Sequence, residues 1–223
     1  MATQNPAKRK AVLTADVVGS RHIPAKVLEA RMAAIARMLE AQVGQGEKLF
    51  EFYRGDSFQA IIGAEDALKV ALLWRAALKA TEGPYTWDIR IAIGLGEISH
   101  LGTSLAVSGG TAFQYSGTLL DQMKQDDDAR IRFHTDDESW TAALHTECLL
   151  AEGLISRWTA TGAETVFNLL YYGDTQDALA TRMGVSQPAI HKRLQAANWA
   201  AIRHWEQFYR QTITQRTKAT EIK

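Results

Sequence analysis

Between residues 175 and 199 (TQDALATRMGVSQPAIHKRLQAANW) the chain carries a pattern that leaves few folds open. Thr175 precedes a run with helical periodicity and is a typical N-cap, while Gly184 follows that run, where a left-handed residue ends a helix. Ser186 is a second N-cap candidate, and Pro188 stands in a first helical turn, where its missing N–H costs nothing. The pattern predicts two helices joined by a tight turn.

The apolar residues of this segment predict how the two helices pack. Leu179, Ala180 and Met183 share one side of the first helix, and Ile190 and Leu194, four residues apart, share one side of the second. Ala180 is small where two crossing helices would come close. An ordinary helical hairpin with a glycine turn is the alternative, because such pairs are common.

The other side of the second helix is polar, and the charge of the chain is unevenly divided. Residues 164–223 carry 8 Lys and Arg against 5 Asp and Glu, whereas residues 1–163 carry 17 against 20. Glutamine can read adenine in the major groove, and lysine can reach guanine or phosphate. The segment therefore predicts binding to double-stranded DNA. The residues expected at the DNA are Thr175, Ser186, Gln187, Pro188, Ala189, His191, Lys192, Arg193 and Arg203.

The first part of the chain alternates between strand and helix patterns. Residues 11–18 (AVLTADVV) are typical of a buried strand, and residues 49–53 and 57–62 predict a hairpin. Residues 87–95 and 130–135 predict further strands, and Leu105–Val107 is a short strand candidate. The predicted order β-α-β-β-α-β-β-α-β indicates an α+β fold with helices on one face of a sheet. We expect this domain to span residues 8–160, followed by an all-α helix-turn-helix domain over residues 161–215.

Two aspartates stand at suggestive points of this pattern. Asp16 lies near the end of the first strand, and Asp56 lies in a hairpin turn. If the first strand pairs beside the hairpin, both carboxylates meet at one edge, where they can hold Mg²⁺ and, through it, a triphosphate. The alternative is that both are solvated turn residues, because Asp is favoured in turns.

Several segments resemble known proteins. ADVVGSR and FYRGDSFQAII resemble the metal-binding strand and hairpin of class III nucleotidyl cyclases, DIRIAIGLGEI is similar to their next strand, and SGGTAFQYSG falls where their catalytic helix begins. LAxxMGVSQxAIxxRL resembles the helix-turn-helix of bacterial repressors and sigma-factor-like domains. Together these segments resemble the cyclase-related SatD-like family, some members of which carry such a C-terminal module.

The resemblance implies a ferredoxin-like, cyclase-like sheet and a possible site for Mg²⁺ with a nucleotide. Asp16 and Asp56 match the metal ligands, and Val17, Val18, Gly19 and Ser20 match the phosphate-cradling turn. The cyclase Asn and Arg that steady the triphosphate fall near Phe113 and Gly117 here, and the purine-selecting Lys falls near Phe52. Arg54, Arg21 and Lys48 are the candidates to replace the missing Arg.

Loss of that Arg removes a fixed cation from the leaving pyrophosphate, so we expect a sensor or dimerisation domain rather than an enzyme. The predicted function is a sequence-specific transcriptional regulator. An active nucleotidyl cyclase or nucleotidyl transferase using Asp16 and Asp56 is the alternative, and a purely structural partner-binding protein is a third. We expect a homodimer, because one helix-turn-helix reads only a few base pairs.

Composition bounds the remaining choices. The single cysteine, Cys148, cannot form an internal disulfide, and no apolar stretch is long enough to span a bilayer. The basic N-terminus is not followed by the apolar core of a secretory signal. These features predict a cytoplasmic protein that does not enter a membrane.

Overall fold

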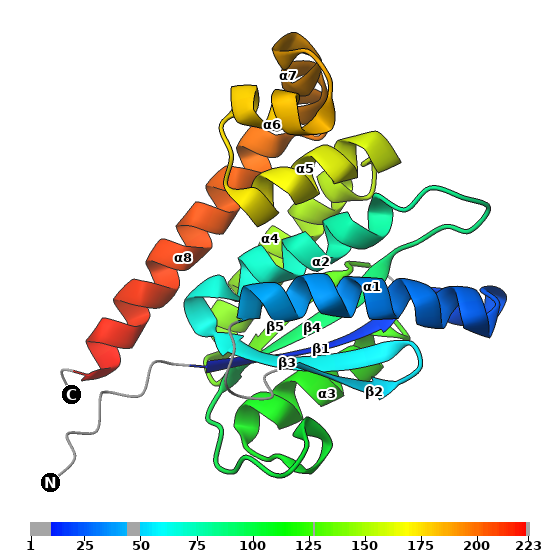
Figure 1. Cartoon of the computed structure of the whole chain (residues 1–223). Coiled ribbons are helices and arrows are strands. Elements are labelled where there is room, and N and C mark those ends of the chain that lie inside the picture. The colour runs from blue at the N-terminus through cyan, green and yellow to red at the C-terminus, as the bar shows by residue number, and fades with distance from the viewer. Residues whose placement is uncertain (1–9, 44–49, 127, 222–223) are drawn as a thin grey trace, which may run out of the picture.

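The computed structural model describes residues 10–43, 50–126 and 128–221, and it has the α+β class that the sequence predicts (Figure 1). The strands are β1 (Lys10–Val17), β2 (Phe50–Arg54), β3 (Ser57–Gly63), β4 (Ile89–Gly96) and β5 (Ile131–Thr135). The helices are α1 (Ala25–Val43), α2 (Ala67–Lys79), α3 (Thr111–Met123), α4 (Glu138–Ile155), α5 (Ala160–Tyr172), α6 (Gln176–Met183), α7 (Gln187–Ala196) and α8 (Trp199–Glu221).

The five strands form one sheet in the order β2-β3-β1-β4-β5. β1 is central and pairs antiparallel with both β3 and β4, while β5 pairs parallel with β4. The register places Asp16 opposite Ser57 on β3 and opposite Arg90 on β4. The end of β1 therefore lies beside the β2–β3 hairpin turn, as the sequence analysis expected.

Helices cover both faces of the sheet, so the expectation of helices on one face is wrong. Ala11 and Leu13 of β1 belong to the core cluster that contains α1 and α2, whereas Val12 packs with Ala112 of α3. Figure 1 shows α3 on the opposite side of the sheet from α1 and α2. Successive strand residues point to opposite faces, and residues 11–17 are all buried, because both faces are covered.

The segment Leu105–Val107, expected as a strand, is a single 3-10 turn. The Ser108 amide donates to the Leu105 carbonyl at 3.1 Å, and the Ser108 hydroxyl donates to the Ser104 carbonyl at 2.9 Å. Leu105 is buried in the cluster that also contains Val12. The apolar residue that suggested a strand thus covers the α3 side of the sheet without joining it.

Close contact between β4 and α3 depends on Gly94. A Cβ atom at this position would lie 2.1 Å from the Ala112 carbonyl oxygen and 2.8 Å from the Ser116 amide nitrogen, both of them backbone atoms. The helix lies so near the strand that only hydrogen fits between them.

We therefore expect Gly94→Ala to lower the free energy of unfolding by about 2 kcal/mol, because α3 must move away from the sheet. Denaturant unfolding of both proteins measures this difference. Gly117→Ala is the control. Gly117 lies on α3, where an added Cβ atom would meet no neighbouring segment within 4 Å, so the helical propensity of alanine should stabilise the protein by about 1 kcal/mol. Equal stability of the two variants would contradict the close approach.

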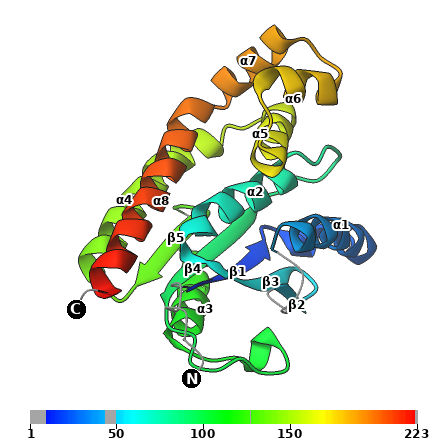
Figure 2. The same ribbon diagram turned by 60° about the vertical axis from the view of Figure 1, so that its left-hand side comes forward.

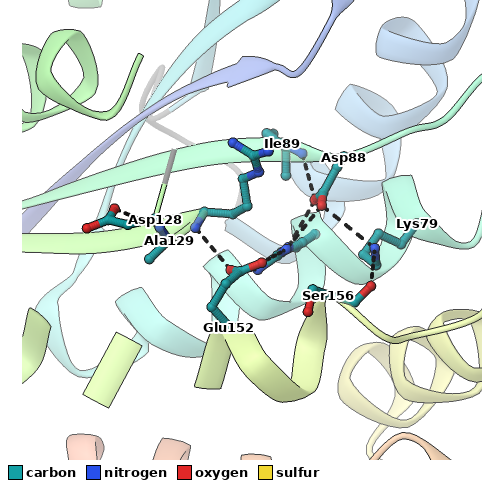
Figure 3. Close-up of polar contacts among 9 residues, drawn as sticks. Lys79, Asp88, Ile89, Asp128, Ala129, Glu152 and Ser156 are labelled. Atoms are coloured by element: carbon teal, nitrogen blue, oxygen red, sulfur yellow. Dashed lines mark hydrogen bonds and ion pairs between the residues drawn. The ribbon is translucent and has the colours of Figure 1, made fainter. Parts of the chain in front are cut away.

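A buried arginine joins α2, the start of β4 and α4. Arg75 is 1% exposed, and its guanidinium donates to Asp88 at 2.9 and 3.0 Å and to Glu152 at 2.5 and 2.7 Å. Glu152 also accepts from the Arg130 amide at 3.0 Å, and Lys79 contacts Asp88 at 3.7 Å (Figure 3). This network fixes α4 against α2 and the start of β4.

The C-terminal helices pack on the sheet domain rather than standing apart from it. One cluster of buried apolar residues includes Leu72 of α2, Val166 of α5 and Ile190 of α7. The Tyr209 hydroxyl of α8 donates to the Ala64 carbonyl at 2.7 Å. Figures 1 and 2 show α5 beside α2 and α8 returning along α4. In the described part of the chain, the regions 8–160 and 161–215 therefore share one core.

Candidate functional site

The helices α6 and α7 are joined by the tight turn that the sequence predicts. The Thr175 hydroxyl accepts from the Ala178 amide at 3.3 Å and caps α6. Gly184 ends α6 with φ of 64°, a left-handed conformation that costs glycine little. The Val185 amide then donates to the Ala180 carbonyl at 3.1 Å, which closes the turn.

The start of α7 differs from expectation in one detail. Ser186 occupies the N-cap position with extended backbone angles, and Pro188 lies in the first turn. The Ser186 hydroxyl makes no capping hydrogen bond, although its carbonyl accepts from the Ala189 and Ile190 amides at 3.0 and 3.2 Å. Ser186 thus begins the helix through its backbone, and its exposed hydroxyl is available to a ligand.

The apolar residues of α6 and α7 pack as predicted. Leu179 and Ile190 are fully buried, Ala180 and Leu194 nearly so, and Met183 is half-buried. The Trp158 indole donates to the Ala197 carbonyl at 2.8 Å, which fixes the end of α7.

The polar side chains that we expected at DNA lie on the outer side of α7. Gln187, His191 and Lys192 are exposed, and the Gln187 amide group contacts Gln176 Oε1 at 3.4 Å. The remaining expected contacts are Thr175, Ser186, Pro188 and Arg203, which are exposed, and Ala189 and Arg193, which are half-buried. One face of α7 is thus anchored in the core while the opposite face meets solvent.

A hollow of about 690 Å³ lies along one flank of α7. It brings together three of the predicted residues: Thr175, the N-cap of α6, His191 of α7 and Arg203 of α8. The hollow's other polar residues, Asp174, Gln176, Gln195 and Asn198, were not predicted from the sequence. Asn198 has φ of 52°, and this left-handed residue directs α8 away from α7. A left-handed asparagine between two helices could have been suspected, but its place in the hollow depends on tertiary packing.

A second cluster of predicted residues lies at the end of β1. The Val17 amide donates to the Asp56 carbonyl at 3.0 Å, so Asp16 and Asp56 come to the same edge of the sheet. The Asp56 carboxylate accepts from the Ser20 hydroxyl at 2.6 Å and from the Ser57 hydroxyl at 3.2 Å. The two aspartates thus lie at the same end of the sheet, as predicted, and Asp56 is near enough to act on the pKa of Asp16.

Asp16 is buried among charges of both signs. Its carboxylate lies 3.6 Å from Arg90 Nη1 and 3.8 Å from Lys124 Nζ, and its Oδ1 atom is buried without a hydrogen-bond partner. Burial raises the pKa of Asp16, Arg90 and Lys124 act to lower it, and Asp56 adds to the increase, so that the pKa stands above its ordinary value.

This edge fits a divalent cation and a nucleotide poorly. Arg90 and Lys124 already pair with Asp16, and no group of three or more His, Cys, Asp or Glu gathers within the described residues. The Val17 and Val18 amides, expected to cradle phosphate, donate to backbone carbonyls at 3.0 and 2.9 Å. Gly19 is left-handed with φ of 67°, and the side chain of Arg54 lies outside the described residues.

Since the pKa of Asp16 is raised in the folded chain, its contribution to stability is greatest below the unfolded-state pKa and falls as pH rises through the folded-state pKa. At neutral pH we expect Asp16→Asn to increase the free energy of unfolding, on the order of 1 kcal/mol. Unfolding curves across the acid range should show the gain disappearing as pH falls. Asp121→Asn, at an exposed carboxylate, is the control. A loss of stability at neutral pH in Asp16→Asn would refute this account.

A scan against protein-family models finds no match, and a search of the curated proteins finds no significant relative. Among the described residues, no helix combines the length and the apolar character needed to cross a membrane.

Proposed function

We propose that the chain is a sequence-specific DNA-binding transcriptional regulator in which α6 and α7 form a helix-turn-helix and α7 enters the major groove. The observation that carries the proposal is the division of α7 into a buried side, with Ile190 and Leu194, and an exposed polar side, with Gln187, His191 and Lys192. A helix held in this way offers side chains to a groove without losing its packing.

Electrostatics supports the same face. No acidic residue occurs between Asp177 and Glu206, a stretch that contains Lys192, Arg193 and Arg203 besides Arg182, which pairs with Asp174. Positive charge close to the reading helix attracts the phosphate backbone and supplies most non-specific affinity.

The sheet domain acts in this proposal as a sensor or dimerisation module with a ferredoxin-like arrangement. The continuous core from α2 through α5 to α7 gives a physical route by which a change at the sheet could shift α7. A homodimer belongs to the proposal, because two linked reading helices multiply the affinity of one.

The proposal predicts that Gln187→Ala relaxes base preference. Loss of a paired contact to a base should cost about 1–3 kcal/mol for the preferred half-site and little for a non-specific duplex. Binding of both proteins to a selected site and to single-base variants measures this. Gln207→Ala, an exposed glutamine on α8, is the matched control. Unchanged base preference in Gln187→Ala would place the reading residues elsewhere.

The second candidate function is nucleotidyl cyclase or transferase activity, favoured only by the proximity of Asp16 and Asp56. Purified protein incubated with each nucleoside triphosphate and Mg²⁺ or Mn²⁺ tests it. Product that disappears in Asp16→Ala would support the enzymatic function. Absence of product from the wild type would leave DNA-binding regulation as the proposed function.

A further inference from the structure

A second hollow, of about 280 Å³, lies between the start of α5 and the later half of α7. Its lining combines three cationic side chains, the first turn of α5 and a small apolar floor. The lining residues are Arg157, Trp158, Thr159, Thr161, Gly162, Lys192, Arg193, Ala196 and Ala197, and no acidic residue is among them. We name it the α5–α7 hollow.

The cations of this hollow differ from two other arginines of the C-terminal helices, Arg182 and Arg210. Arg182 pairs with Asp174 at 2.8 Å, and Arg210 pairs with Asp66 at 2.8 Å. By contrast, in the part of the chain that the structure describes, Arg157, Lys192 and Arg193 have no carboxylate within ion-pair distance. Three uncompensated positive charges around one concave site favour an anion.

The first turn of α5 adds a backbone N–H donor to the α5–α7 hollow. The Thr159 hydroxyl accepts from the Gly162 amide at 3.1 Å and the Thr159 carbonyl accepts from the Ala163 amide at 2.8 Å. The first amides of a helix have no partner within the helix, so the amide of Thr161, a residue that lines the hollow, complements the three cations. The Trp158 indole, bound to the Ala197 carbonyl, holds the floor in place.

The α5–α7 hollow and the larger hollow lie on different flanks of α7. Successive helical residues are rotated by about 100°. Lys192 and Ala196 line the α5–α7 hollow, whereas His191 and Gln195 line the larger one. The exposed side of α7 thus has a cationic recess along one edge, which is where a backbone strand would run if α7 lay in a groove.

We infer that the α5–α7 hollow is a phosphate-binding site, with Arg157 as a ligand that the sequence pattern did not reveal. Its chemistry is that of a phosphate monoanion or dianion, or of one phosphodiester group. That the phosphate comes from DNA rests on the proposed function; the site itself does not.

The first arm of the test uses inorganic phosphate and the full chain. We expect the backbone amide signals of Thr161 and Gly162 and the Trp158 indole signal to shift in saturable fashion during an NMR titration with phosphate, and not with chloride at equal ionic strength. Arg157→Ala should weaken the phosphate affinity at least threefold. Arg37→Ala, an exposed arginine on α1, should leave it unchanged.

The second arm uses a duplex of arbitrary sequence at several salt concentrations. A lost phosphate contact reduces the slope of log affinity against log salt by about 0.9, so Arg157→Ala should show a slope smaller by that amount and Arg37→Ala should not. Phosphate binding without duplex binding would keep the site and reject DNA as its source. If Arg157→Ala changes neither the phosphate affinity nor the slope, the site is wrong even if the protein binds DNA.

Discussion

Arg75→Met is expected to lower the free energy of unfolding by about 3–5 kcal/mol, because it leaves two partly buried carboxylates without their shared cation. The Asp88 and Glu152 side chains are only 15% and 17% exposed, so water cannot fully replace the guanidinium. Methionine fills the space of the arginine stem but offers no donor. Denaturant unfolding at neutral pH measures the loss.

The pH dependence of this loss follows from Asp88. Burial raises the pKa of Asp88, but the charge and hydrogen bonds of Arg75, assisted by Lys79, outweigh burial and hold the pKa below its ordinary value. The stabilisation is therefore present above the unfolded-state pKa and is lost as pH falls through the folded-state pKa. The difference between wild type and Arg75→Met should narrow in acid.

Lys79→Met is the control for this network. Its ammonium group lies at the edge, 3.7 Å from Asp88, so its loss should cost about 1 kcal/mol or less. If Arg75→Met were as stable as Lys79→Met, the buried network would not hold α4 against α2 and β4.

Reversing one exposed charge on α7 and one on α8 is expected to lower duplex affinity about a hundredfold. Lys192 and Arg203 line hollows on different flanks of the helix, so the double variant Lys192→Glu, Arg203→Glu affects both edges of the proposed interface. Two lost contacts of about 1.4 kcal/mol each correspond to two factors of ten. Both side chains are exposed, so stability should change little.

Titration of a labelled duplex measures the loss, and circular dichroism of each variant checks the fold. The matched control is the double variant Arg21→Glu, Arg37→Glu, which reverses two exposed arginines of the sheet domain and should bind as the wild type does. Equal weakening of duplex binding in both double variants would mean that only net charge matters and that α7 is not the DNA-binding surface.

Local signals predicted the C-terminal helices well. Thr175 caps α6, Gly184 ends it in a left-handed conformation, and Ile190 is a buried apolar residue of α7. Each of these roles follows from the residue type and its near neighbours in the sequence. The approach of Asp56 to Asp16 was also predictable. If β1 pairs with β3, the end of β1 must lie beside the hairpin turn that precedes β3.

Contacts between distant segments were beyond the sequence. Arg75 pairs with Glu152, which is 77 residues away in the sequence. Arg157 joins Lys192 only because α5 packs beneath α7. The position of α3 was missed because a strand that is buried on both faces has no alternation to reveal the second layer.

The measurement that tests the proposed function most directly is an NMR map of the full chain as a short duplex is added at low salt. We predict that the largest amide shifts fall on α7 from Gln187 onward and on its two flanks, and that they weaken steeply as salt is raised. Absence of duplex binding at low salt, or shifts confined to the sheet domain, would contradict the proposal that α7 reads DNA.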